Sequence, residues 1–130
     1  ASGSIITGEL ASVYPTVIVF VIDLVRSTNP STFMSNMLQA CSILYKYKLP
    51  FVIAFNKVDI VSSDFAFDWL QNYESFEEAV SKETDFASCL IQSLCLSLEE
   101  FYKNIKACGV SGITGEVSAL EYHSNFFNCK

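Results

Sequence analysis

A run of nine residues, TVIVFVIDL at positions 16–24, constrains the fold of this chain more than any other feature of its sequence. The run is apolar on both faces of an extended strand and rich in β-branched side chains, and Asp23 stands near its end. Strands that are apolar on both faces are typical of parallel sheets covered by helices, whereas a strand at a solvated edge alternates apolar and polar residues. The run therefore predicts a strand buried inside a parallel sheet.

Helical and extended segments alternate along the rest of the chain. Thr28-Asn29-Pro30 supplies a cap and a first-turn proline for a helix, and Leu49-Pro50 ends that helix. The apolar spacing predicts a helix over 31–47, a strand over 51–55 and then a short helix that carries Phe65, Trp69 and Leu70. A longer helix is expected over about 84–106, and the chain leaves it near Gly109. A strand end with a turn is expected at 110–112. Such alternation predicts an α/β fold with a parallel sheet and right-handed crossovers.

Composition excludes several classes of function. The 130 residues are 51% apolar and 17% charged, with a mean hydropathy of +0.34, which is too hydrophobic for a disordered chain. The net charge of −6 provides no basic surface for nucleic acid and opposes binding to an anionic membrane. We therefore expect no nucleic-acid partner and no membrane partner.

The cysteines and the single histidine limit the chemistry further. Five cysteines at irregular spacing, with no CxxC pair, do not form the framework of a disulfide-rich secreted domain, and they indicate reduced thiols in a cytosolic or nuclear protein. They are Cys41, Cys89, Cys95, Cys108 and Cys129. One histidine, His123, excludes a metal site built on a histidine pair, and we interpret it as a surface residue.

The segment with most chemical content is Asn56-Lys57-Val58-Asp59, an NKxD motif that directly follows the strand at 51–55. The carboxyl ends of parallel strands are where open α/β folds bind ligands. The two oxygens of Asp59 suit the N1–H and N2–H₂ donors of guanine, which adenine does not offer. Asn56 would bond the base edge and neighbouring loops, and the stem of Lys57 would lie along the base plane. A solvated loop is the alternative interpretation.

Two further positions have weaker signals. Ser111-Gly112 follows a short apolar segment and is either a second loop whose backbone N–H faces the base or an ordinary turn. Asp23 ends a buried strand as a magnesium-binding aspartate does, but the sequence contains no GxxxxGK[ST] loop to accompany it. We therefore expect no metal ligand and name no catalytic residue.

The stretch TNPSTFMSNMLQACSILYKYKLPFVIAFNKVDI, from Thr28 to Ile60, resembles the GPN-loop GTPases, and most of all their larger eukaryotic paralogue. The similarity extends from the opening ASGSIIT to about Gly115, after which residues 116–130 form a divergent tail. The resemblance implies a partial three-layer α/β/α P-loop NTPase fold. It assigns Asn56, Lys57 and Asp59 to guanine recognition, and Ser111-Gly112 to a later loop in which glycine replaces alanine.

The same resemblance implies a function for the complete protein. It would be a dimeric enzyme that binds and hydrolyses GTP with Mg²⁺, supports assembly and nuclear import of RNA polymerase II, and shuttles from the cytoplasm to the nucleus. Its partners would be a GPN-loop GTPase subunit and RNA polymerase II subunits or assembly factors.

Residues 1–130 would be the C-terminal part of a single GPN-loop GTPase domain. In the family the phosphate-binding loop, the switch motifs and the Gly-Pro-Asn loop precede the equivalent of Ala1, and none of them is in this sequence. We therefore expect the 130-residue piece alone to be inactive and to need Mg²⁺ only as part of the full-length protein. Two alternatives stay open: a non-catalytic interaction module that pairs with full-length GTPase subunits, and an unrelated flavodoxin-like ligand domain with a chance NKxD.

Overall fold

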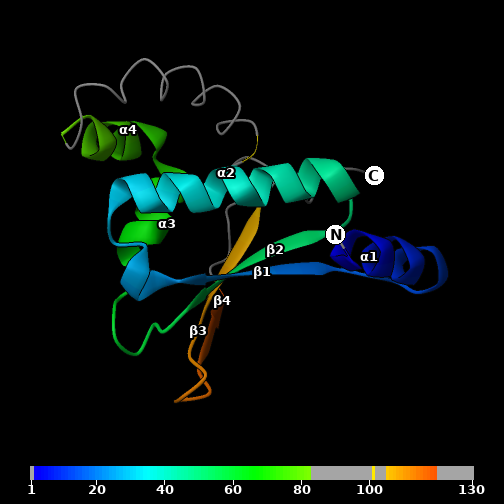
Figure 1. The fold of residues 1–130 in the computed structure, drawn as a ribbon. Coiled ribbons are helices and arrows are strands. Elements are labelled where there is room, and N and C mark those ends of the chain that lie inside the picture. Colours follow the sequence, from blue (N-terminus) through cyan, green and yellow to red (C-terminus); the bar gives the residue numbers. More distant parts are fainter. Residues whose placement is uncertain (1, 83–100, 102–104, 120–130) are drawn as a thin grey trace, which may run out of the picture.

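The computed structural model describes residues 2–82, 101 and 105–119 (Figure 1). The bounds of its elements are α1 Ser2–Val13, β1 Ile18–Asp23, the short 3₁₀ helix η1 Leu24–Arg26, α2 Pro30–Tyr47, β2 Phe51–Asn56, α3 Asp64–Gln71, α4 Tyr73–Ser81, β3 Lys106–Val110 and β4 Val117–Ala119. Most of the helix predicted over 84–106 lies outside the described residues. No helix in the described ranges is both long enough and apolar enough to cross a membrane.

The strands form one sheet in the order β1-β2-β3-β4. β1, β2 and β3 are parallel, and β4 pairs antiparallel with β3. The register aligns Asp23 with Asn56, and Asn56 with Val110, so three parallel strands end at the same level. These features confirm the predicted α/β class and the parallel sheet.

Helix α2 follows its sequence signals closely, and it lies with α3 and α4 above the sheet in Figure 1. The side chain of Asn29 accepts a hydrogen bond from the backbone N–H of Thr32 at 3.1 Å, and Pro30 occupies the first turn, where its missing N–H costs nothing. Lys48 closes the helix in the left-handed conformation, with φ of 52°. Capping thus fixes both ends of the helix that was predicted over 31–47.

An aromatic cluster joins these helices to the sheet. The ring centroid of Phe33 on α2 lies 6.2 Å from that of Phe55 on β2, 5.1 Å from that of Trp69 on α3 and 5.6 Å from that of Phe76 on α4. Phe33, Phe55 and Phe76 are buried almost completely. Because Phe55 directly precedes Asn56, the cluster fixes the end of β2 and the start of the NKxD loop.

The position of β1 differs from the prediction. Among the described strands, β1 lies at the edge of the sheet and has a hydrogen-bonded neighbour on one side only. The side chains of its helix-covered face pack in or against the core, and they are Ile18, Phe20 and Ile22. On the opposite face Val17, Val19 and Val21 are 54%, 54% and 60% exposed. A strand with the composition of an interior strand therefore occupies an edge, because the described chain supplies neither a second neighbour nor a cover for these valines.

The prediction for the C-terminal part was wrong in one respect. Ile105 is not helical and Lys106 already belongs to β3, and Gly109 lies within the strand rather than where a helix ends. Pairing with β2 overrides the helical spacing here, because it places Ala107 beside Ile53 in the core. The strand end and turn expected at 110–112 are confirmed.

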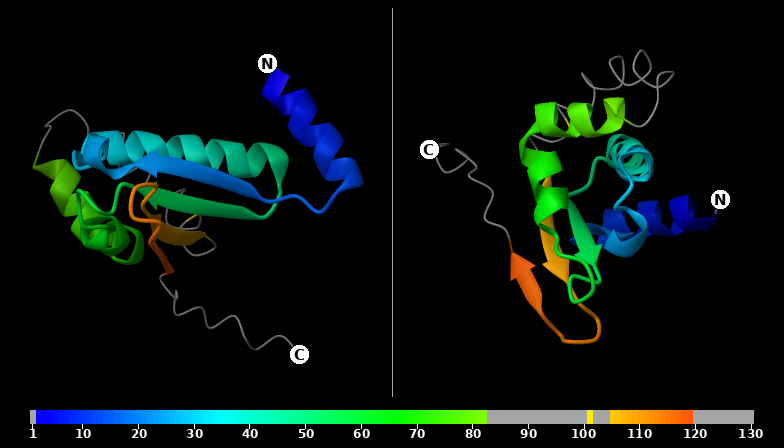
Figure 2. Two further views of the ribbon diagram at one scale, coloured as in Figure 1. Left: turned by 90° about the horizontal axis from the view of Figure 1, so that it is seen from below. Right: turned by 90° about the vertical axis from the view of Figure 1, so that its left-hand side faces the viewer.

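Among the elements that have no counterpart in the prediction are β4 and α1. β4 forms at the start of the tail that was expected to be divergent, and its partner is β3. Helix α1 has no buried residue, and Figure 2 shows that it stands off from the sheet at the end where β1 begins. Of the cysteines within the described ranges, Cys41 is buried, Cys108 is half-buried, and both are free thiols.

Candidate functional site

The candidate site lies where the parallel strands end. β1 ends at Asp23, β2 at Asn56 and β3 at Val110, and the register places the three residues side by side across the sheet. Each strand is followed by a turn or loop that carries polar side chains. Parallel pairing thus brings together three segments that lie far apart in the sequence.

The loop after β2 is short and attached to its surroundings at several points. The side-chain oxygen of Asn56 accepts a hydrogen bond from the N–H of Lys57 at 2.9 Å, and the N–H of Val58 donates to the carbonyl of Val110 at 3.3 Å. The carbonyl of Lys57 accepts from Ile60 and Val61 at 3.1 and 3.2 Å. Lys57 has φ of 71°, a left-handed conformation that non-glycine residues seldom adopt. The loop therefore has one defined shape in which Lys57 forms the sharp bend.

Asp59 is held by the loop after β3. The hydroxyl of Ser111 donates a hydrogen bond to Asp59 Oδ1 at 2.5 Å and accepts from the N–H groups of Ile113 and Thr114 at 3.3 and 3.2 Å. One donor and two acceptors are the full capacity of a hydroxyl group, and Ser111 is only 4% exposed. The carboxylate of Asp59 is exposed to solvent, so Ser111 orients it and leaves acceptor positions open to a ligand.

Gly112 follows Ser111 in an exposed turn. Apart from Gly112 itself and its two chain neighbours, no heavy atom of the described residues lies within 4 Å of the position that a Cβ would take there, and the φ of Gly112 is not positive. Alanine would therefore fit at this position, as the expected equivalence of a Ser-Gly and a Ser-Ala loop requires.

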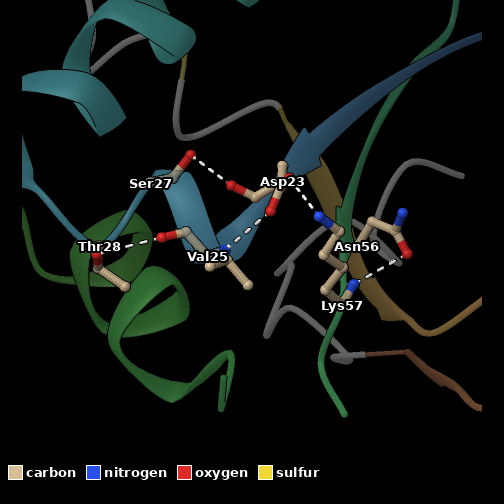
Figure 3. A network of polar contacts seen from close by, with 6 residues as sticks. All are labelled: Asp23, Val25, Ser27, Thr28, Asn56 and Lys57. Carbon is tan, nitrogen blue, oxygen red and sulfur yellow. Dashed lines mark hydrogen bonds and ion pairs between the residues drawn. The ribbon is translucent and has the colours of Figure 1, made fainter. Parts of the chain in front are cut away.

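Asp23 pairs with Lys57 (Figure 3). Asp23 Oδ2 lies 2.6 Å from Lys57 Nζ, and Asp23 Oδ1 accepts the N–H of Val25 at 3.0 Å as the cap of η1. The hydrogen bond from Lys57 is the main cause that lowers the pKa of Asp23 below its ordinary value. The carboxylate is thus occupied by an ammonium group, and no three His, Cys, Asp or Glu side chains within the described ranges gather as a metal site. The expectation that this sequence holds no metal ligand stays a prediction.

The contacts of Asp23 continue into helix α2. The hydroxyl of Ser27 donates to the carbonyl of Asp23 at 2.9 Å and accepts from Asn36 Nδ2 at 2.9 Å. Ser27 is completely buried. A hollow of about 400 Å³ beside the free edge of β1 is lined by Asp23, Ser27 and Asn36 among others, but by no residue of the NKxD loop. Asp23 thus lines the hollow and contacts the NKxD loop through Lys57.

The structure brings together Asn56, Lys57, Asp59 and Ser111, which the sequence singled out. Sequence reasoning missed the role of Asp23 as the partner of Lys57. The signal was available, because two aligned parallel strands that end in Asp and in Asn-Lys place opposite charges at one edge. His123 lies outside the described residues.

Comparison with known proteins shows the family of this chain. Residues 1–120 match the model of a family described as conserved hypothetical ATP binding protein. The chain is 48% identical to GPN-loop GTPase QQT2 of Arabidopsis thaliana over 97% of this chain and 36% of that protein. It is 45% identical to GPN-loop GTPase 1 of Dictyostelium discoideum over 97% of this chain and 34% of that protein. It is 47% identical to GPN-loop GTPase 1 of Saccharomyces cerevisiae over 89% of this chain and 33% of that protein.

The chain thus spans about a third of the length of these curated relatives. The match nevertheless covers the strand ends and loops of the candidate site, from β1 to β4. The parallel sheet is that of a partial P-loop NTPase fold. On the family model and on these relatives, the chain belongs to the GPN-loop GTPase family of nucleotide-binding proteins.

Proposed function

We propose that this chain forms the guanine-recognition part of a GTP-binding site, with Asn56, Lys57, Asp59, Ser111 and Gly112 as its residues. The observation that carries the proposal is the hydrogen bond between Ser111 and Asp59. This bond joins two loops 52 residues apart and holds an exposed carboxylate at the carboxyl end of the sheet. Ligands of open α/β folds bind at that end.

The chemistry of Asp59 favours guanine over adenine. A carboxylate presents only acceptors at neutral pH, and guanine offers two adjacent donors, N1–H and N2–H₂. Adenine has an acceptor at N1 and no amino group at C2, so it would leave the carboxylate unpaired. The description of the matching family model names ATP binding, whereas the relatives are named GTPases. The residues at this site favour binding of a guanine nucleotide.

The substitution Asp59→Asn tests the proposal. An amide places one N–H₂ donor where guanine also has donors, so two charge-assisted bonds are lost and GTP affinity should fall by about 100-fold. Xanthine carries an oxygen at C2 in place of the amino group, so the variant should bind XTP better than GTP. Competition binding of GTP, XTP and ATP to the complete polypeptide that carries this sequence measures the change.

A matched control is Asp68→Asn, which removes an exposed carboxylate from helix α3 outside the loop. Its preference for GTP should equal that of the unsubstituted protein. An Asp59→Asn protein that keeps its preference for GTP over ATP and XTP would exclude the proposed role.

For the complete protein we propose, on the resemblance described above, hydrolysis of GTP with Mg²⁺ in support of RNA polymerase II assembly and nuclear import. A GPN-loop GTPase subunit would be the dimer partner, and RNA polymerase II subunits or assembly factors would be the clients. The protein would act in the cytoplasm and shuttle to the nucleus. Depletion of the protein should then retain RNA polymerase II subunits in the cytoplasm, and an unchanged nuclear fraction would count against this proposal.

The exposed valines of β1 favour a second candidate function, a non-catalytic module that pairs with full-length GTPase subunits. An apolar strand at a sheet edge offers unpaired backbone groups to another chain. Capture of a longer GPN-loop GTPase subunit by the 130-residue chain, without bound nucleotide, would support this function. GTP binding by the same chain alone would argue against it.

A further inference from the structure

Asp23 is not among the residues that the proposed function uses, yet three polar contacts connect it to its surroundings beside the NKxD loop. Its two carboxylate oxygens serve different elements, since Oδ1 accepts from Val25 in η1 and Oδ2 pairs with Lys57 Nζ at 2.6 Å. Its backbone carbonyl accepts from Ser27. Figure 3 shows these contacts converging on Asp23 at the end of β1.

We propose that Asp23 is a positioning residue for the nucleotide base, which acts by holding the ammonium group of Lys57 at the end of β1. This inference deepens the proposed function and depends on it. Asp23 would not touch the nucleotide. It would instead fix the course of the Lys57 side chain, so that the methylene stem presents one surface to the base.

The backbone of Lys57 explains why such an anchor is needed. Lys57 combines a left-handed conformation, which is strained for a residue with a side chain, with a long and flexible stem. Its carbonyl accepts from Ile60 and Val61, so a change in its backbone would move the segment that leads to Asp59. An ion pair with Asp23 favours the single arrangement in which both the stem and the loop are in place.

Asp23 is itself fixed by buried contacts. Ser27 is 0% exposed and is bonded both to the Asp23 carbonyl and to Asn36 on helix α2. The Lys57–Asp23 pair is also less exposed than an ordinary surface pair, with side chains 43% and 31% exposed. It joins residues 34 positions apart, which belong to neighbouring strand ends. A rigid anchor of this kind can position a flexible partner.

Another ion pair in the same chain provides a control. Glu78 on α4 pairs at 2.8 Å with Lys82, the residue that caps the same helix, and both side chains are 71% exposed. This pair has the same chemistry but connects no two elements. Glu78→Gln should therefore leave nucleotide binding unchanged.

The experiment measures binding of the fluorescent nucleotide mant-GDP to the complete polypeptide that carries this sequence. Asp23→Asn removes the charge but keeps an acceptor for Val25, because asparagine also caps helices well. Lys57→Met keeps the apolar stem and removes the ammonium group. Each single variant should weaken binding by about fivefold, as loss of one ion pair of this exposure predicts. The double variant should bind mant-GDP no more weakly than the single variant with the lower affinity.

That lack of additivity separates positioning through Lys57 from a merely structural role of Asp23. Binding that stays unchanged in Asp23→Asn, or losses that multiply in the double variant, would overturn the inference. If Asp23→Asn lowers the melting temperature, the test rests on Lys57→Met alone, since this variant leaves the cap of η1 intact. Unchanged affinity of Lys57→Met for mant-GDP would then overturn the inference. If the unsubstituted protein shows no preference for mant-GDP over mant-ADP, the proposed function fails, and this inference fails with it.

Discussion

The substitution Ser111→Ala tests the central contact of the site. It removes one hydrogen bond to a carboxylate and two bonds accepted from backbone N–H groups, and only the first joins two loops. A bond to a charged group contributes about 1.5–3 kcal/mol. Asp59 and the two amide-bearing residues are exposed, so water replaces part of each lost bond. We therefore expect a loss of about 1–1.4 kcal/mol, or about five- to tenfold in the Kd for GTP.

The assay is competition of GTP and of ATP against mant-GDP on the complete polypeptide. GTP should bind about five- to tenfold more weakly, and ATP should be unaffected, because under the proposed function only guanine would bond to the carboxylate of Asp59. Ser62→Ala is the matched control. Its hydroxyl also donates to an aspartate, Asp64, at 2.6 Å and accepts that residue's N–H at 3.2 Å, but it joins no second loop.

Two results would refute this reasoning. Equal losses in Ser111→Ala and Ser62→Ala would show that the contact between the two loops has no special effect on the base. A Ser111→Ala protein that loses affinity for ATP as much as for GTP would show that the serine supports the fold and not the orientation of Asp59.

Phe33→Ala should lower the free energy of unfolding by about 3–5 kcal/mol, because it empties the centre of the aromatic cluster, and a denaturant midpoint close to that of the parent would contradict this. The hydrogen bond and charge of Lys57 lower the pKa of Asp23, so the ionised Asp23 stabilises the folded state. This stabilisation is complete above the ordinary pKa of aspartate and disappears as the pH falls through the lowered pKa. Chemical denaturation at a series of pH values measures the difference in stability between the parent and Asp23→Asn. This difference should shrink in acid, and a constant difference would disprove the link between the ionisation of Asp23 and stability. The exposed valines of β1 should make the isolated 130-residue chain aggregate, and Val19→Thr with Val21→Thr should reduce this aggregation in light scattering. A parent chain that stays monomeric and unfolds in a sharp two-state transition would contradict this expectation.

The sequence predicted those parts of the fold that local signals determine. Helix α2 has a capping asparagine, a first-turn proline and a proline beyond its end, and β2 is a continuous apolar run. α1 lacks such signals, because glycine and β-branched residues lower its helix propensity, and β3 is short and contains Gly109. Pairing with β2 decides that β3 is a strand, and single-sequence periodicity does not contain that information.

The site divides in the same way. Residues of the NKxD loop could be predicted because their types and their place after a strand are local features. The contacts of Asp59 with Ser111 and of Lys57 with Asp23 join residues 52 and 34 positions apart, so they depend on the register of the sheet. No pattern along the chain specifies that register for β1, whose two faces are both apolar.

The ambiguity of β1 gives the polar strand ends a second consequence, for folding. Where one face of a strand is polar, a slip of one residue exposes its apolar side chains and is penalised, but β1 would present apolar side chains to the helices in either alignment. A slip of one residue moves the strand by about 3.3 Å, which would break the 2.6 Å contact of Asp23 with Lys57. Hydrophobic burial already favours the native alignment, because the slip would replace Ile18, Phe20 and Ile22 on the buried face by smaller valines. The charged pair at the edge of the sheet adds a second penalty against the slip, so the contact that is proposed to position Lys57 also helps to select the native pairing of the strands.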